Sequence, residues 1–417
     1  MIHNLVGNSV EYKETELGLI PLNWEIIEQG KVAQFLNGRA YKQTEFVESG
    51  TPIVRIQNLT GGSNYVFSNL NLDENKYINK NDLIYAWSAT FGPYIWKGNR
   101  SIYHYHIWKI KVDEKYLDKI FFFYRLDYIS REMHSQKNGS AFAHITKGGM
   151  EKHKIPLPPL QEQQKIAEIL SAADEQIEIT DNLIKKTKEL KISLMQRLFT
   201  EGINYKKFKT TIIGDIPLEW EIDRLDNLTT LITDGSHFSP AETKGTKYRI
   251  ATVKNMLIDK FNLANLISIN EADFNNLKRN NCSPQKGDIL LSKDGTIGKS
   301  FVYNQEEDIV LLSSIAIIRP DFEKINPNFI SHFLKNPYTL SRIIGMKSGS
   351  AIKRIVLKDI KGLNVVVPPL VEQEKIADML SSVDDQIEIY EKQKQKQLEL
   401  KKALMQQLLT GELRVTV

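Results

Sequence analysis

Two stretches of about forty residues, 158–200 and 368–410, carry apolar residues at helical spacing and contain no proline beyond their first two positions. Intervals of four and three residues alternate along each stretch, which predicts a helix that buries one narrow stripe. The stripe positions are Ile166, Leu170, Ala173, Ile177, Thr180, Ile184, Thr187, Lys191, Leu194 and Leu198, and then Ile376, Leu380, Val383, Ile387, Tyr390, Lys394, Gln397, Lys401, Leu404 and Leu408. The middle of each stripe is polar, and Gly202 and Gly411 supply the stop signals.

A helix of about 40 residues at ~1.5 Å per residue measures about 60 Å, which exceeds an ordinary domain helix. We expect the two helices to pair as a coiled coil. The antiparallel arrangement is favoured because residues 203–365 form a whole domain between them. The alternative is two unrelated surface helices, one in each domain.

The remaining regions mix short β-rich runs with helical stretches. Residues 103–112 and 311–318 predict strands, and residues 117–133 and 327–344 predict helices. The expected fold class is therefore α/β (α+β), with two globular domains joined by a long antiparallel two-helix coiled coil.

The chain repeats one framework after about 200 residues, which indicates a duplicated domain rather than a short-period solenoid. Residues 18–26 return as 214–222, residues 81–84 as 287–290, and residues 139–141 as 349–351. Residues 158–200 align with 368–410 without a gap, and more than half of the positions are identical. The predicted boundaries are a first domain at 1–157, a central helix at 158–202, a second domain at 203–367 and a distal helix at 368–417. The repeat predicts a pseudo-twofold arrangement.

The amino-acid composition limits the classes of protein to which this chain could belong. The apolar fraction of 41% and the charged fraction of 25% are those of an ordinary globular protein. The single cysteine argues against a disulfide framework and a cysteine-based zinc site. We recognise neither a signal peptide nor a membrane span in the sequence, and we expect a cytoplasmic protein. The net charge of +4 is compatible with nucleic acid but is weak support by itself.

The motifs that resemble catalytic sites are incomplete. Residues 295–300 resemble a phosphate-binding loop, but Lys293 stands where its first glycine belongs, so a tight turn between strands is favoured. Residues 336–338 resemble the adenine-binding motif of amino-methyltransferases with one proline missing, which favours a turn after a helix. A nuclease-like pair at Glu242 and Lys244 has poor spacing, and His104 and His106 lack a third ligand. We therefore expect no catalytic centre and no metal site.

The residue types that remain suit recognition of nucleic acid. Arginine and lysine pair with guanine edges or phosphates, and asparagine and glutamine pair with adenine. The candidate DNA-binding residues of the first domain are Arg39, Tyr41, Lys42, Arg55, Gln57, Asn58, Lys97 and Arg100. Those of the second domain are Lys244, Lys247, Arg249, Lys254, Asn255, Lys293, Lys299, Lys353 and Arg354, with Tyr248 beside them.

The order of motifs resembles that of the specificity subunits of type I restriction–modification enzymes, over essentially the whole chain. An Ile-Pro-x-x-Trp motif opens each domain, at residues 20–24 and 216–220. A Pro-Pro-Leu stretch with Glu-Gln and Lys-Ile-Ala closes each domain, at residues 158–167 and 368–377. Leu-Met-Gln stands near the far end of each helix, at residues 194–196 and 404–406.

This resemblance implies two target-recognition domains, each reading one half of a bipartite DNA target, with the helices as a spacer. Because the domains differ outside their framework, we expect an asymmetric target. The implied partners are double-stranded DNA, two modification (methyltransferase) subunits and restriction (translocase/nuclease) subunits. S-adenosylmethionine, ATP and Mg²⁺ are expected on those subunits and none on this chain. The candidate partner-binding residues of the helices are Gln163, Ile166, Leu194, Leu198, Gln373, Ile376, Leu404 and Leu408.

Two other functions remain open from the sequence. One is a coiled-coil scaffold or a DNA-targeting protein of another defence system, which would lack a restriction partner. The other is a fused enzyme that cuts DNA itself, and the incomplete motifs argue against it.

Overall fold

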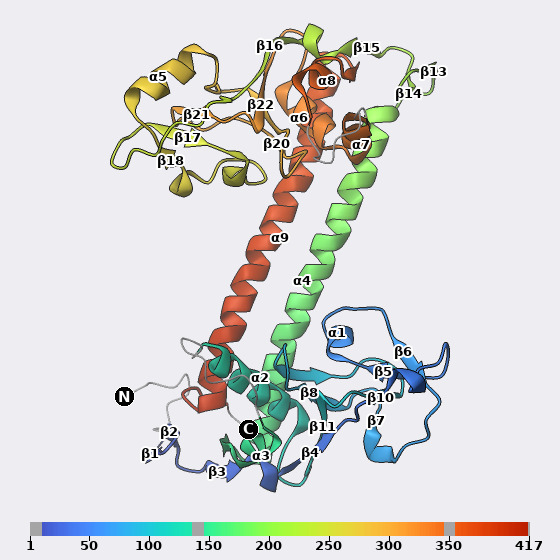
Figure 1. Ribbon diagram of the computed structural model, residues 1–417, viewed down its shortest axis with the longest axis vertical. Helices are drawn as coiled ribbons and strands as arrows, with labels where there is room; N and C mark the ends of the chain where they lie inside the picture. Colours follow the sequence, from blue (N-terminus) through green and yellow to red (C-terminus); the bar gives the residue numbers. More distant parts are fainter. Residues whose placement is uncertain (1–10, 136–145, 346–354, 416–417) are drawn as a thin grey trace. The chain divides into compact units, whose positions relative to one another are not determined.

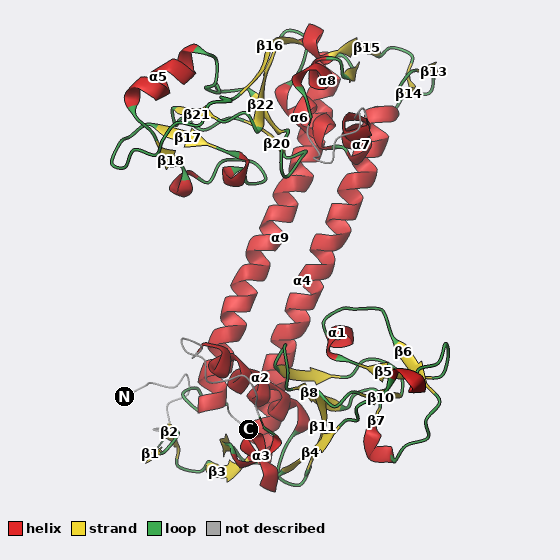
Figure 2. Cartoon of the chain, in the orientation of Figure 1, coloured by secondary structure: helices red, strands yellow, loops and turns green. Residues whose placement is uncertain are grey.

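The structure is a computed structural model that describes residues 11–135, 146–345 and 355–415. Its residues form two compact units. Unit 1 contains Met1–Asp181 and Gln393–Val417, and unit 2 contains Asn182–Lys392. Each unit combines β-sheets with helices (Figure 2), so the mixed α/β class predicted from the sequence is confirmed.

Unit 1 is built around two four-stranded sheets (Figure 1). The first is antiparallel throughout, and its order is β4 (Ala33–Asn37), β11 (Ile107–Val112), β8 (Leu83–Ala86) and β9 (Gly92–Ile95). In the second sheet β10 runs parallel to β5. Its order is β6 (Val66–Ser68), β5 (Thr51–Val54), β10 (Ser101–Tyr103) and β7 (Tyr77–Ile78).

Two strand pairs and several helices complete unit 1. The pairs are β1 (Tyr12–Thr15) with β2 (Gly18–Pro21), and β3 (Glu25–Glu28) with β12 (Lys154–Leu157). The helices are α1 (Ile56–Leu59), α2 (Lys119–Ser135), α3 (Lys147–Lys152), and the 3-10 turns η1 (Gln29–Lys31), η2 (Gln43–Glu45) and η3 (Glu74–Lys76). The largest core of the unit includes Trp24, Phe35, Trp108 and Phe121, with Met405 from the distal helix.

Unit 2 contains the same kinds of sheet. Its antiparallel sheet has the order β16 (Thr229–Asp234), β22 (Ile315–Pro320), β19 (Ile289–Ser292) and β20 (Ser300–Val302). Its smaller sheet has the order β18 (Ile267–Ser268), β17 (Arg249–Ala251) and β21 (Ile309–Leu311), with β17 and β21 parallel. The strand pairs are β13 (Phe208–Thr211) with β14 (Gly214–Pro217), and β15 (Glu221–Arg224) with β23 (Asn364–Val367).

The helices of unit 2 are α5 (Glu271–Arg279), α6 (Pro327–Lys335), α7 (Pro337–Gly345), α8 (Leu357–Lys361), and the 3-10 turns η4 (Leu225–Leu228), η5 (Val253–Asn255) and η6 (Leu263–Asn265). Taken in chain order, β4, β8, β9 and β11 of unit 1 correspond to β16, β19, β20 and β22 of unit 2. The two units therefore share the order of strands in their main sheets.

Three predicted elements prove to be interrupted. Residues 103–112 and 311–318 each contain a tight turn, at 104–106 and 312–314, because the two halves of each run join different sheets. Each turn is closed by one backbone hydrogen bond, from Ile107 N to His104 O at 2.9 Å and from Ile315 N to Leu312 O at 3.1 Å. The predicted helix 327–344 is two helices, because proline at 337 disfavours helical geometry at Asn336.

The loop at residues 293–299 joins two antiparallel strands, β19 and β20. Gly295 and Gly298 have φ angles of 69° and 92°, in the left-handed region that glycine occupies without strain. A phosphate-binding loop would connect a strand to a helix. The predicted turn between strands is confirmed. At residues 336–338 the chain leaves helical geometry only at Asn336, directly after α6, because Pro337 already begins α7.

Two long helices, α4 (Leu160–Thr200) and α9 (Leu370–Thr410), contribute a segment to each unit. In unit 1, Asp174 pairs with Lys401 at 2.5 Å and Asp181 with Lys394 at 2.6 Å. Since the residue number rises along one helix as it falls along the other, the two segments of unit 1 are antiparallel.

In unit 2, Lys191 pairs with Asp384 at 2.5 Å and Lys188 with Glu391 at 2.7 Å, which again describes antiparallel segments. The polar middle of each predicted stripe thus supplies lysines to ion pairs between the helices. Eight apolar positions of the stripes are less than a tenth exposed: Ile166, Leu170, Ile184, Leu198, Ile376, Leu380, Ile387 and Leu408.

One buried tryptophan attaches each domain to a long helix. Trp24 is fully buried and its Nε1 donates to Glu162 Oε2 at 3.0 Å. Trp220 is fully buried and its Nε1 donates to Glu372 Oε2, also at 3.0 Å. The Ile-Pro-x-x-Trp motif and the Glu-Gln motif therefore recur together because they contact each other.

Candidate nucleic-acid interface

In unit 1 the chain after β4 crosses between the ends of β10 and β11. Arg39 N donates to Tyr103 O at 3.1 Å, and Tyr105 N donates to Arg39 O at 3.1 Å. A Cβ on Gly38 would overlap the backbone carbonyl of His104, so only glycine fits at this approach. The crossing fixes the turn at 104–106 against the segment that follows β4.

Two further backbone hydrogen bonds bring other loops to this place. His104 N donates to Val54 O at 2.9 Å, directly before the loop that follows β5. Trp87 N donates to His106 O at 3.1 Å, at the start of the loop that follows β8. We call the residues at this junction, 38–39, 54–55, 87 and 104–106, the crossing of unit 1.

Unit 2 contains an equivalent crossing at residues 235–236, 251–252, 293 and 312–314. A Cβ on Gly235 would overlap the carbonyl of Leu311, as at Gly38. The four equivalent hydrogen bonds are Ser236 N to Leu311 O at 2.7 Å, Ser313 N to Ser236 O at 2.9 Å, Leu312 N to Ala251 O at 3.0 Å and Lys293 N to Ser314 O at 2.9 Å. The backbone of the junction is therefore the same in both units.

A buried asparagine fixes the loop beside each crossing. Asn58 Oδ1 accepts from Arg55 N at 3.0 Å, and Asn58 Nδ2 donates to Asn64 O at 3.0 Å. Asn255 Oδ1 accepts from Thr252 N at 2.9 Å, and Asn255 Nδ2 donates to Asn265 O at 3.0 Å. Both asparagines are less than a tenth exposed, so in this conformation they hold the loop. Their predicted contact with DNA stays a prediction.

Apart from the shared glycine, Gly38 and Gly235, the side chains at the two crossings differ. The pairs are Arg39 and Ser236, Arg55 and Thr252, Trp87 and Lys293, His104 and Leu312, Tyr105 and Ser313, and His106 and Ser314. One backbone arrangement thus presents two chemically different surfaces.

The charge of Arg39 is largely compensated within unit 1. Its guanidinium donates to both carboxylate oxygens of Glu45, at 2.9 and 2.6 Å. These hydrogen bonds lower the pKa of Glu45 to about 2. Burial raises the pKa of the neighbouring Tyr41 hydroxyl, which stays protonated at neutral pH. The two hydrogen bonds to Glu45 fix the orientation of the Arg39 guanidinium. To bind another group, Arg39 would have to exchange this carboxylate for a stronger hydrogen-bond acceptor.

Charge is distributed differently at the crossing of unit 2. Lys293 is 2% exposed, and its Nζ lies 3.0 Å from Asp234 Oδ2. His237 Nε2 lies 3.2 Å from the same oxygen, and the His237 side chain is 66% exposed. The lysine therefore supports the loop from inside, and the exposed polar side chain bound to the same carboxylate is His237, which the sequence reasoning missed.

The structure brings together six of the eight residues predicted for the first domain. Arg39 lies in the crossing and Tyr41 and Lys42 follow it, while Arg55, Gln57 and Asn58 come directly after β5. Lys97 and Arg100 belong instead to the loop between β9 and β10.

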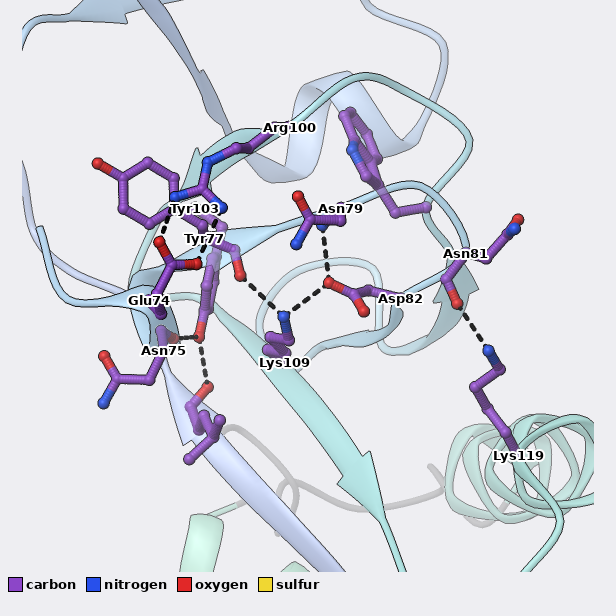
Figure 3. A network of polar contacts seen from close by, with 12 residues as sticks. Glu74, Asn75, Tyr77, Asn79, Asn81, Asp82, Arg100, Tyr103, Lys109 and Lys119 are labelled. Carbon is purple, nitrogen blue, oxygen red and sulfur yellow. Dashed lines mark hydrogen bonds and ion pairs between the residues drawn. The ribbon is translucent and has the colours of Figure 1, made fainter. Parts of the chain in front are cut away.

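Arg100 lies in a separate polar network (Figure 3). Its guanidinium is bidentate to Glu74, at 2.9 and 2.6 Å, and stands 3.9 Å from the centroid of the Tyr77 ring. In the same network Lys109 Nζ lies 2.7 Å from Asp82 Oδ2 and donates to the Tyr77 carbonyl at 3.0 Å. This network anchors the loops around β7 and β8.

The residues predicted for the second domain have diverse settings. Lys244 and Lys247 are exposed, and Arg249 donates to Thr246 O and Ser268 Oγ. Lys299 Nζ donates to Met256 O at 2.7 Å, and Lys254 follows β17 as Gln57 follows β5. The predicted Lys353 and Arg354, and the repeated elements at 139–141 and 349–351, lie outside the described residues.

The predicted partner-binding residues of the helices point into the units. Gln163 and Gln373 are fully buried, and each Oε1 accepts a backbone N–H, from Asp118 and Asn326, at 2.8 Å. Ile166, Leu198, Ile376 and Leu408 are core residues, with Leu194 and Leu404 packed beside them. Gln163, Ile166, Leu198, Gln373, Ile376 and Leu408 present almost no surface to a partner in this conformation, because they fill the contact between helix and domain. Leu194 and Leu404 are partly buried. Binding of partners by the helices stays a prediction.

Known proteins resemble the chain along nearly its whole length. The family model described as type I restriction modification DNA specificity domain matches it twice, at residues 21–189 and 217–400. The chain belongs to the type I restriction–modification specificity family. The MjaVIII specificity subunit of Methanocaldococcus jannaschii is 29% identical over 97% of this chain and 96% of its own length. The EcoBI specificity subunit of Escherichia coli is 24% identical over 89% and 82%.

Solved structures share the fold. A chain from a study of complex assembly and conformational transition of the type I R-M system covers 94% of this chain with a TM-score of 0.59 and 18% identity, over 99% of its own length. The S subunit from M. genitalium covers 93% with a TM-score of 0.55 and 16% identity, over 96% of its own length. The family predicted from the motifs is therefore confirmed, and the chain carries two copies of the specificity domain of that family.

Two searches of the described residues gave negative results. No group of three or more histidine, cysteine, aspartate or glutamate side chains could hold a metal ion within the described ranges. No helix in the described part of the chain is long and apolar enough to cross a membrane.

Proposed function

We propose that this specificity subunit binds double-stranded DNA and reads a bipartite, asymmetric target, one half with each recognition domain. The observation that carries the proposal is the pair of crossings: an identical backbone holds different side chains at six equivalent positions. A shared scaffold needs identical residues only where the fold requires them, as at Gly38 and Gly235. Different side chains on one scaffold present different hydrogen-bonding and apolar groups, and therefore select different DNA sequences.

We propose that α4 and α9 form an antiparallel coiled-coil spacer with pseudo-twofold symmetry, and that the domain boundaries lie at 157, 202 and 367. The support is the buried stripe on each helix and the ion pairs within each unit. Since DNA repeats about every 34–36 Å, a rigid spacer would set the distance between the two half-sites.

We propose that two modification subunits dock on exposed apolar positions that recur on both helices. Ile179 and Ile389 are identical, equivalent in the repeat, and 44% and 55% exposed. Leu190 and Leu400 are likewise identical and are 58% and 59% exposed. Exposed apolar residues that recur in both copies suit two copies of one partner, because each copy meets the same side chains.

We propose that the chain is not an enzyme and that catalysis belongs to its partners. The modification subunits would methylate adenine with S-adenosylmethionine, and the restriction subunits would use ATP and Mg²⁺. The names of the relatives support this division, since they are specificity subunits. We also propose that the complex is cytoplasmic, where it would meet DNA.

A pull-down of the full chain tests the proposal. We expect methyltransferase subunits to co-purify, and the complex to methylate one bipartite DNA motif. Ile389→Asp and Leu400→Asp should each lower the yield of co-purified methyltransferase, whereas the exposed Glu399→Gln on the same helix should not. A complex that binds DNA without sequence preference would contradict the proposed function.

A further inference from the structure

The crossing of unit 1 carries a cluster of aromatic and imidazole rings. Trp87 and His106 lie edge to face with 5.2 Å between ring centroids, and Tyr105 lies 3.9 Å from His106. His104 lies 4.4 Å from Tyr105 and 4.9 Å from His106. We call Trp87, His104, Tyr105 and His106 the ring cluster. Tyr105 is its most exposed member, at 41%.

The buried ring of Trp108 supports the ring cluster from the protein interior. The Trp87 ring stacks on that of Trp108, with 6.0 Å between centroids and 19° between planes, and Trp108 is only 2% exposed. The Trp87 Nε1 donates to the Tyr105 backbone carbonyl at 2.7 Å. Rings fixed by packing lose little entropy when they bind a ligand.

The fold itself does not require these rings. At the equivalent positions unit 2 has Lys293, Leu312, Ser313 and Ser314, and it makes the same backbone hydrogen bonds at similar lengths. If the rings were needed to hold the crossing together, the crossing of unit 2 could not form without them. The rings therefore serve something other than the backbone arrangement.

His104 adds no positive charge to the ring cluster at neutral pH. Burial, with the nearby charges of His106 and Arg55, lowers the pKa of His104 to about 4, so this imidazole is neutral at neutral pH. Arg39, which pairs with His104 in a β-bridge, is bound by Glu45. Phosphates are held chiefly by positive side chains and backbone N–H groups. The aromatic rings and the neutral His104 therefore suit a neutral, partly apolar ligand better than a phosphate.

Base edges in a DNA groove have the complementary chemistry. They present hydrogen-bond donors, acceptors and, on thymine, a methyl group. A tyrosine hydroxyl and a neutral imidazole each offer a donor and an acceptor, and the ring faces offer apolar contact. We propose that the ring cluster, with Tyr105 foremost, contacts base edges and sets the sequence preference of unit 1. This inference rests on the proposed function and assigns its reading residues.

The test uses the complex of the full chain with the methyltransferase subunits that co-purify with it. Methylation is measured on DNA in which each half of the target is randomised in turn. We expect Tyr105→Ala to lower discrimination at one or more base pairs of one half-site by about 5- to 150-fold. Tyr105→Phe, which removes only the hydroxyl, should relax fewer positions. The matched control is Ser313→Ala, at the equivalent position of unit 2, which should leave discrimination at the half-site affected by Tyr105→Ala unchanged.

A second variant, His106→Ala, shows whether the result of Tyr105→Ala comes from lost contact with DNA or from a defect in folding. It should relax the same half-site as Tyr105→Ala, while far-UV circular dichroism and the preference for the other half-site stay as in the wild type. Unchanged discrimination, or an equal loss of affinity for every sequence, would overturn the inference and leave the proposed function standing. A wild-type complex without sequence preference would overturn both.

Discussion

Removal of Arg414 is expected to destabilise unit 1 selectively. Glu162 is 2% exposed and accepts from Trp24 Nε1 at 3.0 Å. Arg414 near the C-terminus supplies the opposite charge, with Nε and a terminal nitrogen 2.6 and 2.9 Å from the two carboxylate oxygens. Arg414→Ala would leave this carboxylate buried with one neutral donor.

The expected cost is about 3–5 kcal/mol, the usual loss when one partner of a buried ion pair is removed. Unit 2 provides the matched comparison. Its Glu372 accepts from three neutral donors, Trp220 Nε1 at 3.0 Å, Tyr205 OH at 2.7 Å and Ile203 N at 2.9 Å. Tyr205→Phe removes one of three donors, so we expect a smaller loss of roughly 1.5–3 kcal/mol, confined to unit 2.

The assay is native-state hydrogen exchange, because a chain with two units need not unfold in one step. Amides of the strands in unit 1 should exchange faster in Arg414→Ala, with those of unit 2 unchanged. In the Glu162→Gln background the same substitution should cost much less, since no buried charge is left unpaired. A loss below about 1 kcal/mol, or equal loss in both units, would refute the assignment of this ion pair to the stability of unit 1.

Three further outcomes are expected. Burial, with the charges of neighbouring lysines, lowers the pKa of His332 from 6.5 to about 3, so only the unfolded chain binds this proton between those values. The stability of unit 2 should therefore fall as pH drops below 6.5, by roughly 2 kcal/mol at pH 5. In unit 1 Tyr124 contacts Ser171 and Asp174 as His332 contacts Ser381 and Asp384, so His332→Tyr should flatten this dependence in denaturant titrations. Gly235→Ala should cost about 1–3 kcal/mol in thermal unfolding, because its Cβ meets a backbone carbonyl, and an unchanged melting temperature would contradict that contact. Four residues inserted after Lys186, about one helical turn, should change the spacer length in the methylated motif, and an unaltered motif would contradict the proposed role of the helices as a spacer.

Sequence periodicity determined the long helices because helical spacing is a local property. The stripe of four-and-three intervals predicted buried positions such as Leu170 and Leu380, and both are fully buried. The duplicated motifs identified the family for a similar reason. Trp24 and Glu162 recur as Trp220 and Glu372 because each pair is joined by a hydrogen bond, so the two residues are kept together.

The candidate site was only partly accessible to sequence reasoning. Arg39 and Arg55 were singled out by residue type, and they do lie at the crossing. Trp87 and Tyr105 were missed because each is ordinary in its own segment. The comparison that would have found them is the alignment of weakly similar loops around Gly38 and Gly235, where the framework glycine recurs while its neighbours differ.

The sequence by itself therefore determined what depends on spacing and repetition: two related α/β domains, two long helices and the family. The tertiary structure decided which polar residues are buried with hydrogen bonds inside the fold, as for Gln163. It also decided where an apparent strand must turn, as at His104. It also brought together the residues of each crossing from four separated segments. Such contacts depend on how strands pair across the sheets, and no local pattern of residues encodes that pairing.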